Sequence, residues 1–433
     1  MAKTAIGGLI MKKRNLALLF CLVFLLLQVS FVHAFTTFKS SHSTYDELKI
    51  FTEVLDIIQK NYVEKPKPKE LIYGAIKGML NSLDPHSSFL TPDEFKELQI
   101  ETKGEFGGVG IEITLKDGWL TVVSPIEDTP AYKAGIKAGD RIVKIDGKFT
   151  RDMSLNEAVK MIRGPKGTKV TLSIWRKGFK EPKDFVITRS IITIKSVKVK
   201  TLEPGYGYVR ITSFQENTTS ELQKALSNLE RQNKPLKGII LDLRNNPGGL
   251  LDQAVKVADV FLNKGLIVYI KGRKESARMD FYAHPNKHPH PYPIVTLVNE
   301  GTASAAEIVA GALQDHHRSL LIGETTFGKG SVQTIIPLED GSALRLTTAL
   351  YYTPSGRCIQ ATGIEPDLVL SDGQVSNSKV SHPFLREKDL ERHLKGIEKR
   401  RRGESKPEPK DVLVNVGLQI LKKWDVLTHL RYN

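Results

Sequence analysis

The sequence predicts an α/β core joined to a smaller, mainly-β domain, with helical segments near both ends of the chain. Beyond residue 205, continuous apolar runs at 238–243, 294–298 and 320–323 predict buried strands that alternate with helices. This pattern is typical of a parallel sheet in an α/β core. Between about 102 and 190, short alternating strands lie between glycine turns. Apolar residues at helical spacing in 45–63 and 411–424 predict the terminal helices.

The first 34 residues predict export. Lys12, Lys13 and Arg14 precede an apolar run at 16–32, and the sequence around Ala34 resembles a small-residue cleavage site. An uncleaved membrane anchor is the alternative, although a run of this length is short for a span. We therefore expect a signal peptide or N-terminal anchor at 1–34, and a location in the periplasm or at the outer face of the cytoplasmic membrane.

Charge and cysteine content limit the partners and cofactors. The formal net charge of +15 is spread along the chain without a nucleic-acid motif, so we expect no nucleic acid and, at most, a peripheral contact with an anionic membrane surface. Only Cys358 lies beyond the first 34 residues, which leaves no internal disulfide there. The histidines at 284, 288 and 290 alternate with prolines, which favours a stiff loop over a metal site, and no metal or cofactor is predicted.

A serine stands at a predicted strand-to-helix turn. The segment 299–308 (NEGTASAAEI) follows the strand ending at Val298 and enters a helix at Ser304. The backbone N–H groups of a first helical turn are unpaired and can bind an oxyanion. Serine is also a common residue at helix N-termini, so Ser304 alone does not identify a nucleophile.

A lysine lies between two glycines in 323–333 (GETTFGKGSVQ). Gly323, Gly328 and Lys329 match a phosphate-binding loop, but Gly330 replaces its hydroxyl residue and a strand is expected to follow. Burial can lower the pKa of a lysine by several units, so Lys329 could act as a general base toward a serine. Gln333 lies four residues on, at a spacing that points to the same side of an extended segment.

Glycines follow the first buried strand of the core. In 241–250 (LDLRNNPGGL) the strand runs into Gly248 and Gly249 and then a helix, a geometry that presents free backbone N–H groups. A plain strand–turn–helix connection would have the same pattern.

Together and in this order, the three segments resemble the C-terminal processing peptidases, or tail-specific proteases. The matching motifs are DLRNNPGG at 242–249, NEGTASAAEI at 299–308 and GETTFGKGSVQ at 323–333. Segments 351–357 and 363–367 also match the family, and 78–88 resembles its helical N-terminal segment. The resemblance spans roughly residues 45 to 370. Thr302 and Ala306 depart from it, because the family more often has serine at both positions.

The resemblance implies an exported serine endopeptidase of the Ser–Lys type. Ser304 would be the nucleophile, Lys329 the general base and Gln333 the third member of the catalytic set. The oxyanion hole would be formed by the N–H groups of Ala305 and of Gly248 or its neighbour.

The mainly-β region resembles the family's PDZ domain. Its carboxylate-binding loop would be formed by Gly107, Gly108, Val109, Gly110 and Ile111, whose successive N–H groups make a nest for an anion. The strand starting at Ile111 would pair with the substrate, so the expected partners are proteins or peptides with a free, apolar C-terminus. A hairpin turn is the simpler interpretation of the same glycines.

The predicted organisation has five parts: a signal peptide or anchor at 1–34, a helical N-terminal domain at 43–98, a PDZ-like domain at 99–192, a Ser–Lys protease core at 193–370, and a basic linker with C-terminal helices at 371–433. We expect the terminal helices to pack on the body of the protein or on a second subunit of a homo-oligomer. Two alternatives are a non-catalytic exported PDZ adaptor and a nucleotide-dependent enzyme that uses the loop at 323–330.

Overall fold

A computed structural model describes residues 44–274, 277–370, 386–390 and 411–425. The chain divides into two compact units, 1–76 and 77–433. The expected signal peptide or anchor at 1–34 and the basic run at 399–402 lie outside the described residues. Among those described, no helix combines the length and apolar character that a membrane span requires.

The helices expected near the N-terminus are present. Helix α2 (Thr44–Asn61) spans the predicted segment, and α3 (Pro68–Asn81) follows the Pro/Lys-rich break. None of the residues of α2 is buried, and Leu48, Phe51 and Val54 of its apolar stripe are each more than 40% exposed.

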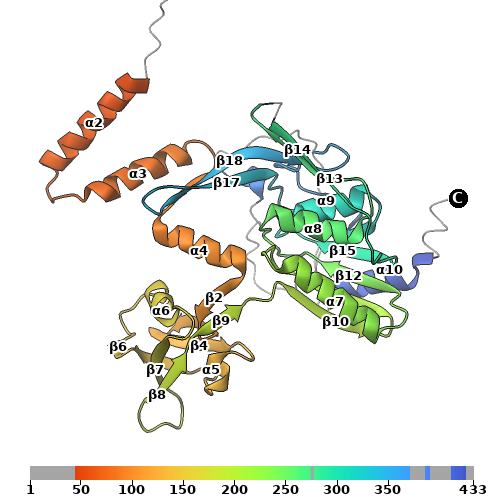
Figure 1. Cartoon of the computed structure of the whole chain (residues 1–433), viewed down its shortest axis with the longest axis horizontal. Coiled ribbons are helices and arrows are strands. Elements are labelled where there is room, and N and C mark those ends of the chain that lie inside the picture. The colour runs from red at the N-terminus through yellow and green to blue at the C-terminus, as the bar shows by residue number, and fades with distance from the viewer. Residues whose placement is uncertain (1–43, 275–276, 371–385, 391–410, 426–433) are drawn as a thin grey trace, which may run out of the picture. The chain divides into compact units, whose positions relative to one another are not determined.

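A six-stranded sheet forms the α/β core (Figure 1). Its order is β10-β11-β12-β15-β16-β19, in which β10 is antiparallel to β11 and the other neighbours are parallel. The strands are β10 (Val197–Glu203), β11 (Tyr206–Ile211), β12 (Gly238–Asp242), β15 (Ile294–Val298), β16 (Ser319–Gly323) and β19 (Leu368–Val369). The prediction of buried parallel strands is confirmed, since every residue of β12 and β15 is buried.

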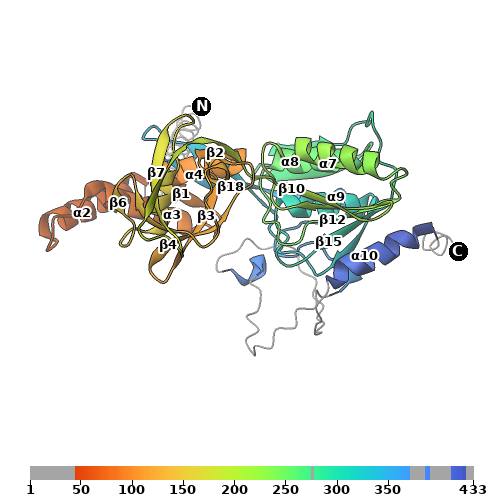
Figure 2. The same cartoon turned by 90° about the horizontal axis from the view of Figure 1, so that it is seen from below.

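Helices cover both faces of this sheet (Figure 2). One face packs against α7 (Thr218–Gln232), α8 (Leu251–Phe261) and α9 (Ala305–Asp315), and the other against α10 (Val412–Lys422). Because side chains alternate along a strand, Ile239 and Leu241 contact the first layer while Ile240 contacts the second. The C-terminal helix therefore packs on the body of the protein, one of the two positions expected for it.

A second sheet is antiparallel and has five strands. Its strands are β1 (Ser88–Leu90), β18 (Ala343–Tyr352), β13 (Leu266–Gly272), β14 (Arg278–Tyr282) and β17 (Ser331–Pro337). β17 and β1 both pair with β18, with Gln333 opposite Thr347 and Ser88 opposite Arg345. This pairing brings the segment after Asp84 close to the strand that follows Lys329.

The region between residues 105 and 193 is mainly β, as predicted. It contains β2 (Glu105–Gly108), β3 (Ile111–Lys116), β4 (Trp119–Pro125), β5 (Arg141–Ile145), β6 (Lys148–Phe149), β7 (Lys169–Trp175), β8 (Lys183–Thr188) and β9 (Ser190–Thr193), with helices α5 (Pro130–Lys133) and α6 (Leu155–Ile162). β3 is the first strand of the order β3-β4-β5-β7-β8, and β2 pairs with β9. Helix α4 (Pro92–Lys103) precedes this region and begins with a capping box at Thr91.

Candidate active site

Three loops meet at one edge of the core sheet. β12, β15 and β16 are parallel neighbours, so the segments after their carboxyl ends lie together, as is common for sites in α/β sheets. These segments are 243–250, 299–304 and 324–330. Each carries one of the motifs that the sequence analysis selected.

Ser304 occupies a strained turn between β15 and α9. Its φ is 54° and its ψ is −116°, a combination that non-glycine residues rarely adopt. Such strain is typical of functional sites, where it lifts a side chain out of the regular helix path. Ser304 is only 6% exposed, and its side chain interacts with the phenol of Tyr351, whose pKa is raised by burial.

Gly248 lies directly against this serine. Its φ is +98°, and a Cβ at this position would lie 2.8 Å from the Cβ of Ser304 and 2.9 Å from the nitrogen of Ala305. The turn therefore requires glycine for both conformation and space. The N–H of Gly248 donates to Oδ1 of Asn246 at 2.9 Å, so in this structure it is already used. The predicted oxyanion role of Gly248 stays a prediction, with Gly249 as its neighbour in the same turn.

Lys329 lies in the turn between β16 and β17. Burial lowers the pKa of its ammonium, and Arg345 lowers it further, whereas the carboxylates of Glu387, Glu307 and Asp84 act in the opposite direction. Among the described residues the ammonium forms no ion pair or hydrogen bond. A lysine in this environment gives up its proton more readily than one in water.

Glu307 connects the serine turn with the lysine turn, and the sequence analysis missed it. Its side chain is completely buried on α9 and accepts the N–H groups of Ser304, Gly328 and Lys329 at 2.8, 2.8 and 2.9 Å, as well as the hydroxyl of Thr326. Burial raises the pKa of Glu307 to about 7, although these hydrogen bonds favour the charged form. The Ser-x-x-Glu spacing of a capping box was the available signal, because it aims the glutamate at the turn before the helix.

Gln333 does not contact Lys329 through a hydrogen bond in the described structure. Its amide nitrogen donates to Oγ of Ser331 at 3.0 Å and to Oγ1 of Thr347 at 3.4 Å. The expected shared direction of Lys329 and Gln333 assumed regular alternation. Lys329 precedes β17, which begins at Ser331, so the two residues do not lie in one regular strand.

The phosphate-loop alternative is not favoured by the geometry. β17 follows Gly330 as a strand, as predicted, so the loop lacks the helix N-terminus that would hold a phosphate. Within the described ranges, no group of three histidine, cysteine, aspartate or glutamate side chains is placed to hold a metal ion.

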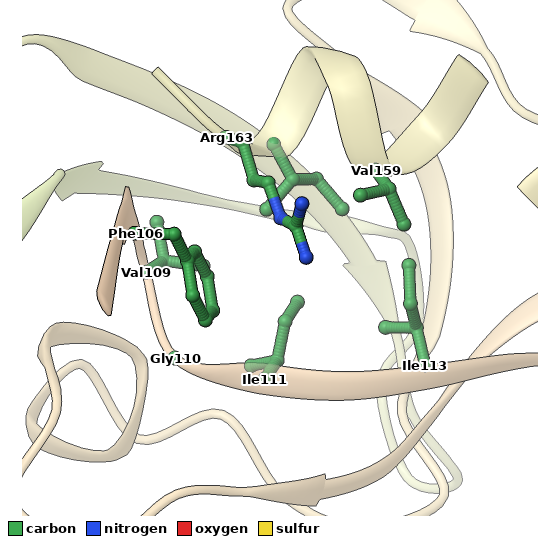
Figure 3. Close-up of a pocket in the computed structure, with 8 residues that line it drawn as sticks. Phe106, Val109, Gly110, Ile111, Ile113, Val159 and Arg163 are labelled. Carbon is green, nitrogen blue, oxygen red and sulfur yellow. The ribbon is translucent and has the colours of Figure 1, made fainter. Parts of the chain in front are cut away.

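The predicted carboxylate-binding loop borders a small cavity in the mainly-β region (Figure 3). The cavity has a volume of about 70 Å³ and is lined by Phe106, Val109, Gly110, Ile111, Ile113, Val159, Ile162 and Arg163. Gly107 and Gly108 belong to β2 and pair with Ile191 and Ser190 of β9, outside this lining. The φ of Gly110 is +81°, and a Cβ there would lie 2.3 Å from Thr129, so this turn also requires glycine.

One charged side chain lines this apolar cavity. Arg163 follows α6, and its guanidinium lies 4.5 Å from the ring centre of Phe106 and bonds the carboxylate of Glu97 at 2.5 and 2.6 Å. The small cavity is therefore apolar, lies beside the first strand of its sheet and has a cation at its border.

Comparison with known proteins identifies the family. The model of peptidase family S41 matches residues 205–370, a PDZ-domain model matches 121–176, and a model of the N-terminal domain of the activating protease CtpB matches 29–93. The carboxy-terminal-processing protease of Bartonella bacilliformis is 48% identical over 394 residues, which are 89% of this chain and 91% of that protein.

Two further relatives extend the similarity. The carboxy-terminal processing protease CtpA of Bacillus subtilis is 40% identical over 371 residues, covering 82% of this chain and 77% of that protein. The carboxyl-terminal-processing protease of Synechocystis is 40% identical over 338 residues, covering 76% and 78%. The three motif loops thus belong to an enzyme rather than to a non-catalytic adaptor. The chain is a member of the carboxy-terminal-processing proteases of peptidase family S41, serine proteases that carry a PDZ domain.

Proposed function

We propose that this protease cleaves peptide bonds by a Ser–Lys mechanism, with Ser304 as nucleophile and Lys329 as general base. The observation that carries the proposal is the shared carboxylate of Glu307, which accepts the backbone N–H groups of both residues. One buried side chain thereby fixes the two turns relative to each other. Gln333 is the proposed third member, positioned on β17 beside Ser331 and Thr347.

The chemistry requires a neutral amine. Lys329 would take the proton from the Ser304 hydroxyl as the oxygen attacks the scissile carbonyl, and would return it to the leaving amine. The N–H of Ala305, at the first position of α9, would stabilise the oxyanion together with an N–H from the Gly248–Gly249 turn. The burial that lowers the pKa of Lys329 supplies the neutral form at a lower pH than a solvated lysine would.

The pH dependence of activity tests the base. Activity should rise with pH as Lys329 loses its proton, with a midpoint below the ordinary lysine pKa of about 10.4. Lys329→Arg keeps the positive charge but cannot deprotonate near neutrality, so it should be as inactive as Lys329→Ala. A folded Lys329→Arg variant that retains more than about a tenth of the wild-type rate, a loss under about 1.4 kcal/mol, would contradict the mechanism.

We further propose that the PDZ domain captures a free, apolar C-terminus. Supporting this are the apolar lining of the cavity, the strand β3 that starts at Ile111, and the guanidinium of Arg163 at the border. Amidation of a substrate's C-terminus removes the negative charge and should raise KM severalfold. Equal cleavage of the acid and the amide would argue against carboxylate recognition.

Export is the third part of the proposal. The charged and apolar pattern of residues 1–34 supports a location in the periplasm or at the outer face of the cytoplasmic membrane. Fractionation of cells that produce the tagged full chain, together with mass spectrometry of its N-terminus, distinguishes a cleaved signal from an anchor. Recovery of the uncleaved protein with the cytosolic fraction would refute export.

A further inference from the structure

A short segment C-terminal to the protease core places a buried carboxylate near the turn that carries Lys329. Residues 386–390 contain the 3-10 helix η2 (Glu387–Asp389). Glu387 is completely buried, whereas its neighbours Lys388 and Asp389 are exposed. Burying a carboxylate is costly unless hydrogen bonds or an opposite charge compensate, so the partners of Glu387 define what it does.

Both carboxylate oxygens of Glu387 have partners. Oε2 lies 2.6 Å from Nε2 of His86, and Oε1 accepts the amide of Gln360 at 2.7 Å. Gln360 in turn accepts the N–H of Gly330 at 2.9 Å through its own Oε1. A continuous hydrogen-bonded path therefore leads from Glu387 to the backbone of the residue after Lys329.

The backbone of the same segment contacts both catalytic turns. The N–H of Glu387 donates to the carbonyl of Phe327 at 3.2 Å, two residues before Lys329. The guanidinium of Arg386 donates to Glu300 at 3.1 Å, on the turn that leads to Ser304. The segment thus holds the turn of the base and the turn of the nucleophile at the same time.

Four charged groups from separate parts of the chain act electrostatically on Lys329. They are Arg345 on β18, Glu307 on α9, Glu387 on η2 and Asp84 before β1. Arg345 lowers the pKa of Lys329, and the three carboxylates raise it. Removing the charge of Glu387 alone should therefore make the lysine easier to deprotonate.

We propose that Glu387 is a positioning residue of the active site, which holds the turn carrying Lys329 through Gln360 and sets the charge opposite the lysine. The proposal rests on the proposed role of Lys329 as the general base. It extends the active site to Glu387, although the residues from 371 onward were expected to form a linker and terminal helices.

The test is the pH profile of the full-length Glu387→Gln variant on a peptide substrate. Glutamine keeps an oxygen that can accept the Gln360 amide, so the turn is retained while the charge is lost. The midpoint of the rise in kcat/KM should move to lower pH by about 0.3 unit or more, a twofold change in proton affinity. Lys388→Gln, a charge change on the exposed face of the same segment, should keep the wild-type midpoint.

A second variant leaves Glu387 in place and tests the hydrogen-bonded path from Glu387 through Gln360 to the turn of Lys329. Gln360→Met keeps an unbranched side chain but frees the N–H of Gly330. It should lower kcat tenfold or more on the pH plateau and leave KM within twofold. An unchanged midpoint in folded Glu387→Gln, an equal shift in Lys388→Gln, or a kcat of Gln360→Met within twofold of wild type would each overturn the proposal.

Failure of this proposal is distinguishable from failure of the Ser–Lys mechanism. If Lys329→Arg retains activity, the base is wrongly assigned and the midpoint has no bearing on Lys329. If Lys329→Arg is inactive and the wild type has its alkaline rise, an unmoved midpoint in Glu387→Gln rejects the role of Glu387 alone.

Discussion

Replacing Glu307 by glutamine is the most direct test of how the two catalytic turns are held together. In the wild type, Oε1 accepts Thr326 and Gly328, while Oε2 accepts Ser304 and Lys329. Glutamine turns one of these oxygens into an NH2 group, which faces two donors and cannot accept from either. The glutamine therefore loses either two hydrogen bonds to the lysine turn or one to each turn, and kcat should fall tenfold or more.

The raised pKa of Glu307 fixes the sign and the size of its contribution to the free energy of unfolding. The pKa of Glu307 rises from 4.5 to about 7 on folding, which is about 2.5 pH units, or about 3 kcal/mol at 1.36 kcal/mol per unit. Because the folded-state pKa lies above the unfolded value, the folded protein binds more protons between these pH values. The contribution of Glu307 to stability is present below pH 4.5 and is lost as pH rises through 7.

Urea unfolding at pH 5 and pH 8, followed by circular dichroism, measures this contribution. The free energy of unfolding of the wild type should fall between the two pH values by about 2–3 kcal/mol more than that of Glu307→Gln, which has no proton to lose. Glu324→Gln is the matched control, because Glu324 lies in the loop before Lys329 and is partly exposed, and its side chain forms no hydrogen bond or ion pair within the described ranges. Equal pH slopes in wild type and Glu307→Gln, or a kcat within threefold of wild type, would refute this account of Glu307.

Three further predictions concern the turn, the nucleophile and the C-terminal helix. Gly248→Ala places a Cβ 2.8 Å from that of Ser304 and should lower kcat/KM at least a hundredfold, about 2.7 kcal/mol in the barrier. Gly118 also has a positive φ but has open space around it, so Gly118→Ala should leave kcat/KM unchanged. Ser304→Ala should abolish cleavage of a peptide substrate without lowering the melting temperature, and turnover above background in the pure variant would exclude Ser304 as nucleophile. Asp411→Asn removes a half-exposed partner of Arg244 and should lower the free energy of unfolding by about 1 kcal/mol at neutral pH. Although partial burial acts to raise the pKa of Asp411, hydrogen bonding to Arg244 holds it below its ordinary value, so this difference should begin to shrink as pH falls below 3.8, and a difference that does not shrink there would contradict it.

Much of the fold follows from local patterns in the sequence. Buried strands such as β12 and β15 are short apolar runs, and the elements after them start where the apolar run ends, so their order and direction are predictable. The same reasoning places Ser304 at a strand-to-helix turn and Lys329 before a strand, because both depend on a few neighbouring residues. The family resemblance then follows from three motifs in a fixed order.

The network around these residues depended on contacts between distant parts of the chain. The pairing of β17 with β18 brings Thr347 to the amide of Gln333, so the segment 323–333 alone does not give this partner of the glutamine. His86 and Glu387 are 301 positions apart and meet only because β1 and β17 pair with the same strand and segment 386–390 lies against the turn of Phe327.

The sequence by itself determined the family, the strand ends and the candidate reactive side chains. Only the tertiary structure decided which groups position these side chains and act on them electrostatically. These groups are Glu307, between the two turns, and Glu387, near the lysine. The physical reason is that periodicity reports the burial of neighbouring residues along one element. Desolvation and nearby charges, which set the proton affinity of Lys329, depend on every element packed around it.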